Sequence, residues 1–179
     1  MFALRYAGFL AGCAVLALGL PATAATGAAQ ERALTQASPV ITAELNIPAY
    51  RLDVWRDSLL IRSYAVAVGL PDFPTPIGDL TITSVTWNPS WRPPASEWAK
   101  DEAFTPPGPT NPMGKVKLLI GNAYYLHGTP ASSSIGRAAS HGCVRMHNED
   151  AVDLASVLQK ETGAALDSIT LDSLLSSWR

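Results

Sequence analysis

The distribution of proline restricts the fold of this 179-residue chain more than any other feature of its sequence. Ten of the fourteen prolines lie between Pro71 and Pro112. Because proline lacks an amide hydrogen and has a fixed φ, this density excludes a helix or a central strand there. We therefore predict a long loop with short extended pieces. A loop of this length in a compact domain is usually functional. It contains the tryptophans Trp87, Trp91 and Trp98, which either fix the loop to a sheet or line a groove.

Outside this segment the alternation of apolar and polar residues predicts a mostly β fold. The expected strands cover residues 40–45, 51–55, 59–68, 79–85, 115–120 and 123–126. A helix is expected from Asn148 or Glu149 to Leu158, with acids in its first turn and an apolar face formed by Ala151, Leu154, Ala155 and Leu158. The tail, 166–178, can add a short amphipathic helix. We predict a β-sandwich or mixed sheet with one or two flanking helices.

The composition excludes several classes of protein. Hydrophobic residues make up 47% of the chain and charged residues 16%, which fits a globular domain and excludes wholesale disorder. Thirteen lysines and arginines against fifteen acids give a net charge of −2, so no nucleic acid partner is expected.

The first 24 residues have the layout of a secretory signal peptide. Arg5 precedes an apolar run, 7–20, and a breaker, Pro21, leads to small residues that end at Ala24. The run is shorter than the ~20 residues that span a bilayer, so we expect cleavage after Ala24 and no stable membrane span. The expected location is the periplasm. A lipidated Cys13 is the alternative, although this cysteine comes early in the apolar run.

The expected organisation places a flexible tether at 25–38, a folded domain at 39–162 and a C-terminal extension at 163–179. Cleavage would leave Cys143 as the one cysteine of the mature chain. A lone thiol in an oxidising compartment is a liability unless it is buried or used, so Cys143 is a candidate functional residue.

All three histidines lie with this cysteine in the 21 residues from His127 to His147. One interpretation is a thiolate nucleophile with a histidine base, in which glycine beside Cys143 permits a sharp turn and a following helix N-terminus lowers the thiol pKa. A second is a zinc site, although the spacing lacks HxxxH and CxxC patterns. A third is that Cys143 is a buried small residue and the histidines are incidental.

The motif His127-Gly128-Thr129 followed by Ser140-His141-Gly142-Cys143-Val144-Arg145-Met146 resembles the catalytic domain of the L,D-transpeptidase (YkuD-type) family. The resemblance extends over about residues 40–160 through further short motifs: 75–79, 88–91, 108–114 and 148–150. Where some members have asparagine two positions after the cysteine, this chain has Arg145.

The resemblance implies a role for each residue of the motif. Cys143 is the expected nucleophile and His127 the general base, with the backbone carbonyl of Gly128 orienting its imidazole. The amides of Gly142 and Cys143 are the expected oxyanion hole. The residues expected on the substrate side or shaping the loop are His141, Ser140 and Arg145, the last as a carboxylate anchor. Arg137 is expected to be a solvated loop residue. Neither a metal nor a cofactor is implied.

The resemblance also implies a reaction on peptidoglycan. Cys143 would take the acyl group of a stem tetrapeptide, release D-Ala and pass the acyl group to an amine of another stem, which forms a 3→3 cross-link. Water as acceptor would make the protein a carboxypeptidase, and a lipoprotein lysine would make it an anchoring enzyme. Two rival interpretations are a cysteine hydrolase that cuts peptidoglycan and a wall-binding module without turnover. Carbapenems are expected to acylate Cys143.

Overall fold

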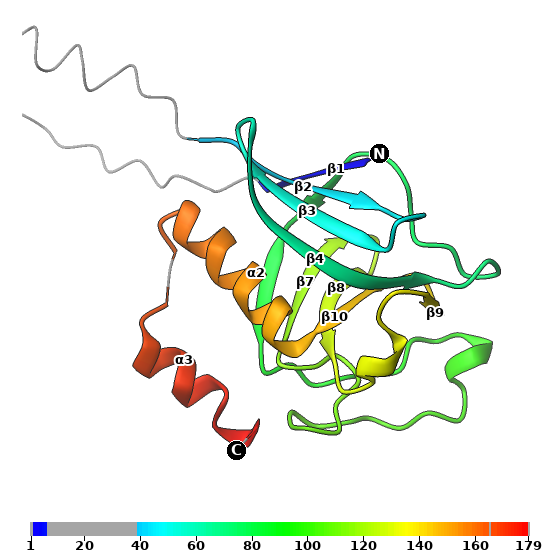
Figure 1. Cartoon of the computed structure of the whole chain (residues 1–179). Coiled ribbons are helices and arrows are strands. Elements are labelled where there is room, and N and C mark those ends of the chain that lie inside the picture. Colours follow the sequence, from blue (N-terminus) through cyan, green and yellow to red (C-terminus); the bar gives the residue numbers. More distant parts are fainter. Residues whose placement is uncertain (1, 7–38, 165, 179) are drawn as a thin grey trace, which may run out of the picture.

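The computed structural model of the protein describes residues 2–6, 39–164 and 166–178, and Figure 1 shows the arrangement of its elements. The strands are β1 Phe2–Tyr6, β2 Ile41–Asn46, β3 Arg51–Arg56, β4 Leu59–Gly69, β5 Leu80–Ile82, β6 Ser84–Trp87, β7 Val116–Gly121, β8 Tyr124–Thr129, β9 Ala138–Ser140 and β10 Val144–His147. The α-helices are α2 Asn148–Glu161 and α3 Ser168–Leu174. The single-turn 3₁₀ helices are η1 Glu97–Ala99, η2 Ser132–Ser134 and η3 Ser176–Trp178.

The strands form one mixed sheet with the order β5-β1-β2-β3-β4-β10-β8-β7-β6, and β9 pairs with β4 off this path. The long strand β4 connects the two halves of the sheet, because its first part pairs with β3 and its later residues pair with β10 and β9. The sheet curls so far that β5, from one end of the order, packs against β7 near the other end. The predicted mostly β class with a mixed sheet and flanking helices is confirmed.

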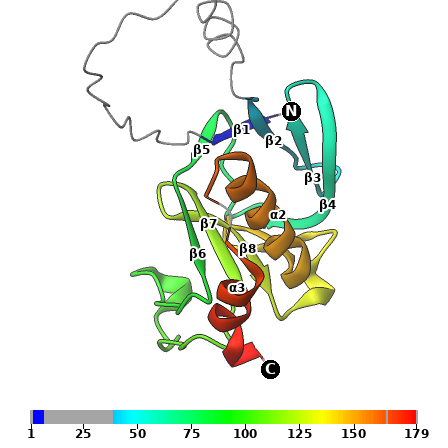
Figure 2. The same cartoon turned by 90° about the vertical axis from the view of Figure 1, so that its left-hand side faces the viewer.

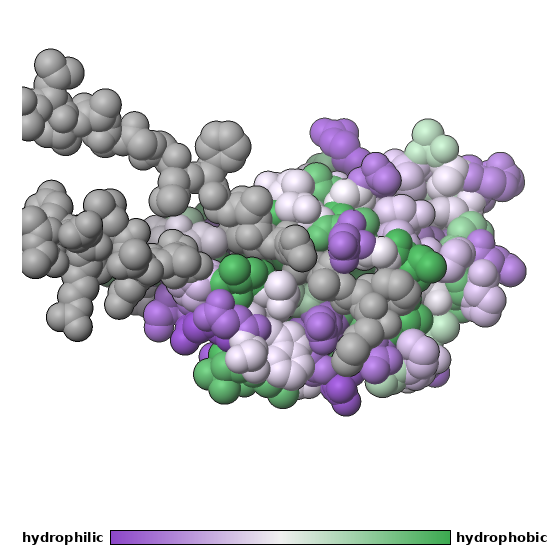
Figure 3. Space-filling model, turned by 90° about the horizontal axis from the view of Figure 1, so that it is seen from above, coloured by the Kyte–Doolittle hydropathy of each residue, from purple (hydrophilic) through white to green (hydrophobic). Residues whose placement is uncertain are grey.

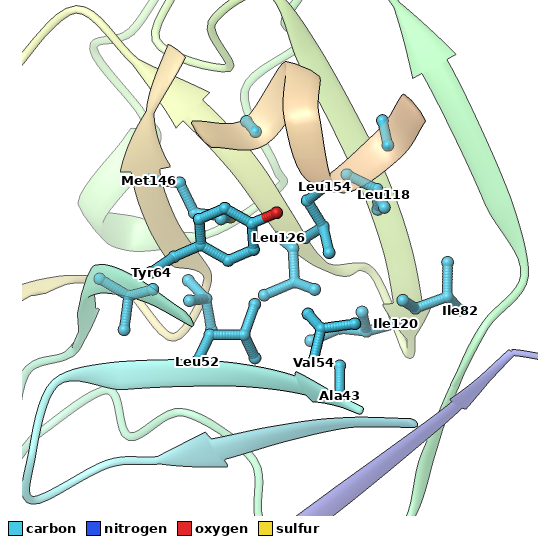
Figure 4. Packing of buried hydrophobic residues seen from close by; sticks show 14 of the residues in the cluster. Ala43, Leu52, Val54, Tyr64, Ile82, Leu118, Ile120, Leu126, Met146 and Leu154 are labelled. Atoms are coloured by element: carbon cyan, nitrogen blue, oxygen red, sulfur yellow. The ribbon is translucent and has the colours of Figure 1, made fainter. Parts of the chain in front are cut away.

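The core lies between the two halves of the curled sheet and α2. Figure 4 shows Leu52 and Val54 of β3 facing Leu154 of α2, with Leu126 of β8 between them and Leu118 of β7 on the side of the helix. The apolar face predicted for the helix is the buried one, because Ala151, Leu154, Ala155 and Leu158 are all within 1% of complete burial. Removal of this apolar surface from water fixes α2 across β7, β8 and β10.

The β7–β8 hairpin sets the register of the strand that carries His127. Its turn places Asn122 and Ala123 at positive φ, 46° and 66°, as a two-residue type I′ hairpin requires. With this turn, Lys117 of β7 lies opposite His127 of β8, and Leu118 lies opposite Leu126 in the core. The hairpin therefore decides which side chains of β8 face away from the core.

The proline-rich segment contains short extended pieces, as predicted. The single run expected over 79–85 is two strands, β5 and β6, which lie on either side of Thr83 and pair with different partners. Thr83 donates its amide to Leu119 O at 2.9 Å. It lies between the pairing of β5 with β1 and the pairing of β6 with β7. Between Asn88 and Lys115 the chain makes a long excursion that includes η1 and an isolated bridge between Trp91 and Thr105.

The described residues near the two ends of the chain lie in different places, with β1 inside the sheet between β5 and β2 and α3 beside the proline-rich segment. The predicted cleavage site after Ala24, Cys13 and the predicted tether, 25–38, lie outside the described residues, and within the predicted signal peptide the described part is β1, which pairs with β2 and β5. The predicted tail helix is α3. After it, Trp178 donates Nε1 to Asn88 Oδ1 at 2.9 Å and connects the tail to the start of the proline-rich excursion. Figure 2 shows α3 beside the end of β6.

No helix among the described residues is long and apolar enough to cross a membrane. On the face of the molecule seen in Figure 3, hydrophilic and hydrophobic residues are interspersed over the described part of the surface.

Candidate active site

A parallel pair of strands brings the predicted site residues together. β8 and β10 run in the same direction with Arg145 opposite His127 and Val144 opposite Leu126. Cys143 immediately precedes β10, so it lies beside the part of β8 that carries His127. Both residues line the same cleft, together with Ser140, His141 and Arg145. The sequence motif is therefore one site in space, although 15 residues separate His127 from Cys143 without a local turn that would join them.

The imidazole of His127 is buried, with 4% of the residue exposed, and has a fixed orientation. Its Nδ1 lies 2.7 Å from the carbonyl oxygen of Gly128. A carbonyl only accepts, so Nδ1 carries the hydrogen and Nε2 keeps its lone pair. Burial, aided by the charges of Arg145 and Lys117 and opposed by the Gly128 carbonyl, lowers the pKa of His127 to about 4. The ring is neutral at pH 7 and can accept a proton at Nε2.

Gly128 has to be glycine because another side chain occupies the space where a Cβ would be. A Cβ built at Gly128 would lie 2.3 Å from Asn148 Oδ1. Asn148 cannot move away easily, since its Oδ1 accepts the Lys115 amide at 2.9 Å and its Nδ2 donates to Thr129 O at 3.3 Å. The first residue of α2 thus fixes the backbone on which His127 depends.

The loop that precedes Cys143 is held by Ser140. Ser140 Oγ donates to Cys143 O at 2.5 Å and accepts the amide of Gly142 at 3.1 Å. Gly142 has φ +104°, and a Cβ there would lie 2.4 Å from the ring of Tyr124. The amide of Gly142, expected in the oxyanion hole, is therefore bonded to Ser140 in this state.

The surroundings of Cys143 differ from one expectation. The helix N-terminus predicted to lower the thiol pKa does not adjoin the cysteine, because β10 lies between Cys143 and α2. Burial raises the pKa of the Cys143 thiol, and the Tyr125 backbone, Arg145 and Lys117 act against burial to lower it. The positive field at the sulfur therefore comes from two side chains on neighbouring strands rather than from the helix.

One of these cations, Lys117, was not identified from the sequence. It is partly buried on β7 with Nζ 4.9 Å from the centre of the Tyr125 ring, and burial lowers its pKa. Nothing in the local sequence separates it from an exposed strand lysine, and only the strand register places it beside His127. Arg137, in contrast, is exposed and donates to Ser133 O within its own loop, as expected of a loop residue.

The opposite wall of the cleft is formed by the proline-rich excursion, which Asn111 organises. This side chain is completely buried, and its Nδ2 lies 2.9–3.1 Å from the carbonyls of Pro89, Thr105 and Pro106. Its Oδ1 accepts the Met113 amide at 2.9 Å. Prolines supply no amide donors, so one asparagine amide provides hydrogen bonds that a regular ladder would otherwise make.

Trp98 connects this wall to the cysteine loop. Its ring is stacked on the ring of His141, with centroids 4.0 Å apart and an interplanar angle of 6°, and Phe73 contacts the same imidazole edge-on at 4.6 Å. Burial and the nearby Arg145 lower the pKa of His141. His141 therefore connects the cysteine loop to the proline-rich wall, and its loop-shaping role stays a prediction. The sequence did not indicate that Trp98 contacts His141 rather than another histidine.

The two walls enclose a cleft of about 440 Å³. Its lining from the proline-rich side consists of Trp91, Trp98, Glu102, Thr105, Thr110, Pro112 and Met113. Among the described residues, no group of three or more histidine, cysteine or acidic side chains is arranged to hold a metal ion. A buried neutral imidazole with a free Nε2, a thiol at the same cleft and cations beside the thiol are the elements of a cysteine–histidine acyl-transfer site.

Comparison with known proteins identifies the family. The family model described as the L,D-transpeptidase catalytic domain, YkuD, matches residues 41–166. A protein of Fuscovulum blasticum, named "Putative L,D-transpeptidase in ATP synthase subunits region ORF 5", is 30% identical over 169 residues, which cover 79% of this chain and 89% of the relative. The chain belongs to the L,D-transpeptidase (YkuD) family, as its motif predicted.

Other relatives match over shorter regions. "Probable L,D-transpeptidase YbiS" of Escherichia coli strain K12 is 48% identical over 68 residues, which cover 36% of this chain and only 22% of the relative. Among solved structures, L,D-transpeptidase 3 from Mycobacterium tuberculosis in complex with a faropenem-derived adduct has a TM-score of 0.51 at 20% identity, covering 64% of this chain and 54% of that one. This structural likeness supports the fold.

Proposed function

We propose that the protein is a peptidoglycan L,D-transpeptidase that forms an acyl-enzyme at Cys143 and transfers the acyl group to an amine. The observation that carries the proposal is the pairing of β8 and β10, which holds a neutral His127 beside Cys143 at one cleft. Family membership narrows the acyl donor to the substrate class of L,D-transpeptidases.

The first half-reaction releases D-Ala. His127 Nε2 takes the proton of the Cys143 thiol, and the sulfur attacks the carbonyl that joins the third stem residue, a diamino acid, to the terminal D-Ala. The tetrahedral oxyanion collapses, the C–N bond breaks, and His127 returns the proton to the amine of the departing D-Ala. A thioester on Cys143 remains.

The second half-reaction transfers the acyl group. The side-chain amine of another stem's third residue attacks the thioester and gives its proton to His127, the C–S bond breaks, and His127 passes the proton to the sulfur to restore the thiol. One amide bond replaces another, so no external energy source is needed. The product is a 3→3 cross-link. Water in place of the amine would release a tripeptide.

The remaining motif residues fit supporting roles. We assign the oxyanion to the amides of Cys143 and Gly142, and the Gly142 donor would have to be shared with Ser140 or released by it. Arg145 is partly buried and has no carboxylate partner among the described side chains, which suits an anchor for a substrate carboxylate. His141 and Ser140 shape the loop on the substrate side.

The same proposal covers location and inhibition. A peptidoglycan substrate lies outside the cytoplasm, so we retain cleavage after Ala24, a tether at 25–38, a catalytic domain at 39–162 and an extension at 163–179, with the mature protein in the periplasm. The structural relative with a faropenem-derived adduct supports the proposal that β-lactams of this kind, carbapenems included, acylate Cys143.

The test is incubation of the protein, from Ala25 onward, with purified disaccharide-tetrapeptide, followed by mass spectrometry. A dimer lighter than two monomers by one D-Ala, with a 3→3 bond located by fragmentation, is the expected product. Cys143→Ala should lose all product while its circular dichroism stays unchanged. Tripeptide alone would replace the transpeptidase with a carboxypeptidase, and turnover by Cys143→Ala would overturn the proposed nucleophile.

A further inference from the structure

Lys117, His127 and Arg145 form a row across three neighbouring strands. Lys117 on β7 is opposite His127 on β8, and His127 is opposite Arg145 on β10. Side chains at paired positions project from the same face of a sheet. The adjacent row, Leu118, Leu126 and Val144, is buried in the core, so the charged row faces the other way, toward the cysteine loop. The histidine is flanked by a cation on each side.

The two cations lack a permanent counter-charge. Neither Lys117 nor Arg145 forms an ion pair with a carboxylate within the described ranges, whereas Lys115, two residues before Lys117, is paired with Glu149 at 3.1 Å. Both are partly buried, and burial lowers the pKa of each, while an anionic Cys143 would raise it. Cations that have lost part of their hydration are stabilised by an anion nearby.

We propose that Lys117 is a positioning residue of this active site, which with Arg145 holds the negative charge on Cys143 sulfur after its proton has moved to His127. The inference rests on the proposed nucleophilic role of Cys143. It adds a residue on the far side of His127 from Arg145, so that cations from two separate strands act on the charge of the sulfur. The aromatic ring of Tyr125 supports the ammonium group in this position.

The charge of Lys117 acts on both partners of the proton transfer. It makes the thiol a stronger acid, which favours the transfer, and it makes His127 a weaker base, which opposes it. It lowers the pKa of the Cys143 thiol and also lowers the pKa of His127. The titratable and charged groups around the sulfur are Lys117 on β7, His127 with Tyr124 and Tyr125 on β8, Arg145 on β10, His141 in its own loop and Glu102 across the cleft. At neutral pH the positive charge among these groups belongs to Lys117 and Arg145.

The experiment measures the rate of Cys143 alkylation by iodoacetamide against pH in purified wild-type protein and Lys117→Met. In Lys117→Met we expect the rate at pH 7 to fall roughly three- to tenfold, because loss of one nearby cation raises the apparent thiol pKa by roughly half to one unit. The imidazole titration of His127, followed by NMR and assigned with His127→Gln, should shift upward as well. Lys117→Arg should restore both values.

Lys115→Met is the matched control, since Lys115 precedes the same strand and its charge is already compensated by Glu149. It should leave both titrations unchanged. Unchanged titrations in Lys117→Met, or equal shifts in both variants, would overturn the inference, and so would a loss of thermal stability without a shift in either pKa. Alkylation does not depend on tetrapeptide turnover, so failure of the proposed reaction would be visible separately.

Discussion

The two walls of the cleft are built in different ways. The wall that carries His127 and Cys143 consists of paired strands, and its register is fixed by backbone ladders and by the core beneath it. The facing wall has a single isolated bridge and is held by the amide of Asn111 and by ring contacts around His141. The chemical groups sit on the wall with backbone support, and the wall held by side chains shapes access to them.

This difference separates two requirements of an acyl-transfer site. A proton shared between a thiol and an imidazole needs positions held to a fraction of an ångström, which a sheet can provide. In the proposed reaction two peptide stems enter and leave, which suits a segment whose few contacts cost less to break. Changes in the sheet wall should therefore affect the whole fold, and changes in the proline-rich wall should act locally.

The largest effect is expected from Gly128→Ala in the sheet wall. The new methyl group would lie 2.3 Å from Asn148 Oδ1, and the hydrogen bonds of Asn148 prevent it from moving aside. We expect a loss of about 3 kcal/mol or more in the free energy of unfolding, measured by urea denaturation, together with loss of activity. Gly136→Ala is the control, because no atom lies within 4 Å of its Cβ and only its φ of +85° opposes alanine. Equal losses in both variants would contradict this account of Gly128.

Asn111→Ala tests the other wall. It removes a donor to three carbonyls and leaves the Met113 amide without its acceptor. We expect a loss of about 2–3 kcal/mol of protection against hydrogen exchange at Trp91 and Thr105, with little change in the amides of β8. Asn111→Asp, which keeps the acceptor and loses the donor, should also lose protection. Equal loss of protection in β8 would show that the two walls unfold together.

The pH dependence of stability sharpens the description of the sheet wall. The pKa of His127 is about 4 in the folded protein and about 6.5 in an unfolded chain, so the unfolded state binds a proton first as the pH falls. Stability is therefore lost between about pH 6.5 and pH 4, and His127 accounts for about 2 kcal/mol between pH 7 and pH 5. Urea denaturation at a series of pH values should show a free energy of unfolding that falls more steeply with decreasing pH in wild type than in His127→Gln. Parallel slopes would show that His127 is not held in its neutral form.

The smallest effect is expected from Trp98→Leu, which removes the stacked ring above His141. An aromatic pair contributes about 1 kcal/mol, so we expect a roughly fivefold rise in the KM for the tetrapeptide with kcat nearly unchanged. Phe104→Leu is the control, since Phe104 is an exposed aromatic residue of the same segment that contacts Arg92 instead. A fall in kcat without a change in KM would mean that Trp98 acts on the chemistry.

Local patterns in the sequence predicted most of the fold. Alternation located β2, β3, β4, β7 and β8 to within a few residues, and the helical spacing located α2. β9 and β10 were missed because each is three or four residues long and owes its existence to its neighbours, β4 and β8. The break at Thr83 was missed for the same reason, since alternation continues through it and only the partners change.

The site was predictable where the motif itself carries the chemistry. The structure brings His127, Ser140 and Cys143 of the motif to one cleft and bonds Gly128 to His127, while their catalytic roles stay predictions. Lys117 was not identified, Asn111 entered only as part of a short motif, and Trp98 had two alternative roles. Their contacts depend on strand register or on the approach of distant segments. A charged residue on a strand has no local signal that tells which neighbour it will face.

Because β8 and β10 pair in parallel, the position of Cys143 relative to His127 does not depend on the length of the loop between the two strands. The stretch between the two strands includes η2 and exposed positions such as Ser133 and Gly136, and the ladder, not this loop, sets the place of Cys143 relative to His127. We therefore expect a change of length at the exposed positions near Ser133 to leave the thiol beside its base as long as the bonds of Gly136 and Arg137 to β4 are kept. A chain divided within 132–137 would yield two fragments, each carrying half of the reacting pair, that should regain activity on reassociation.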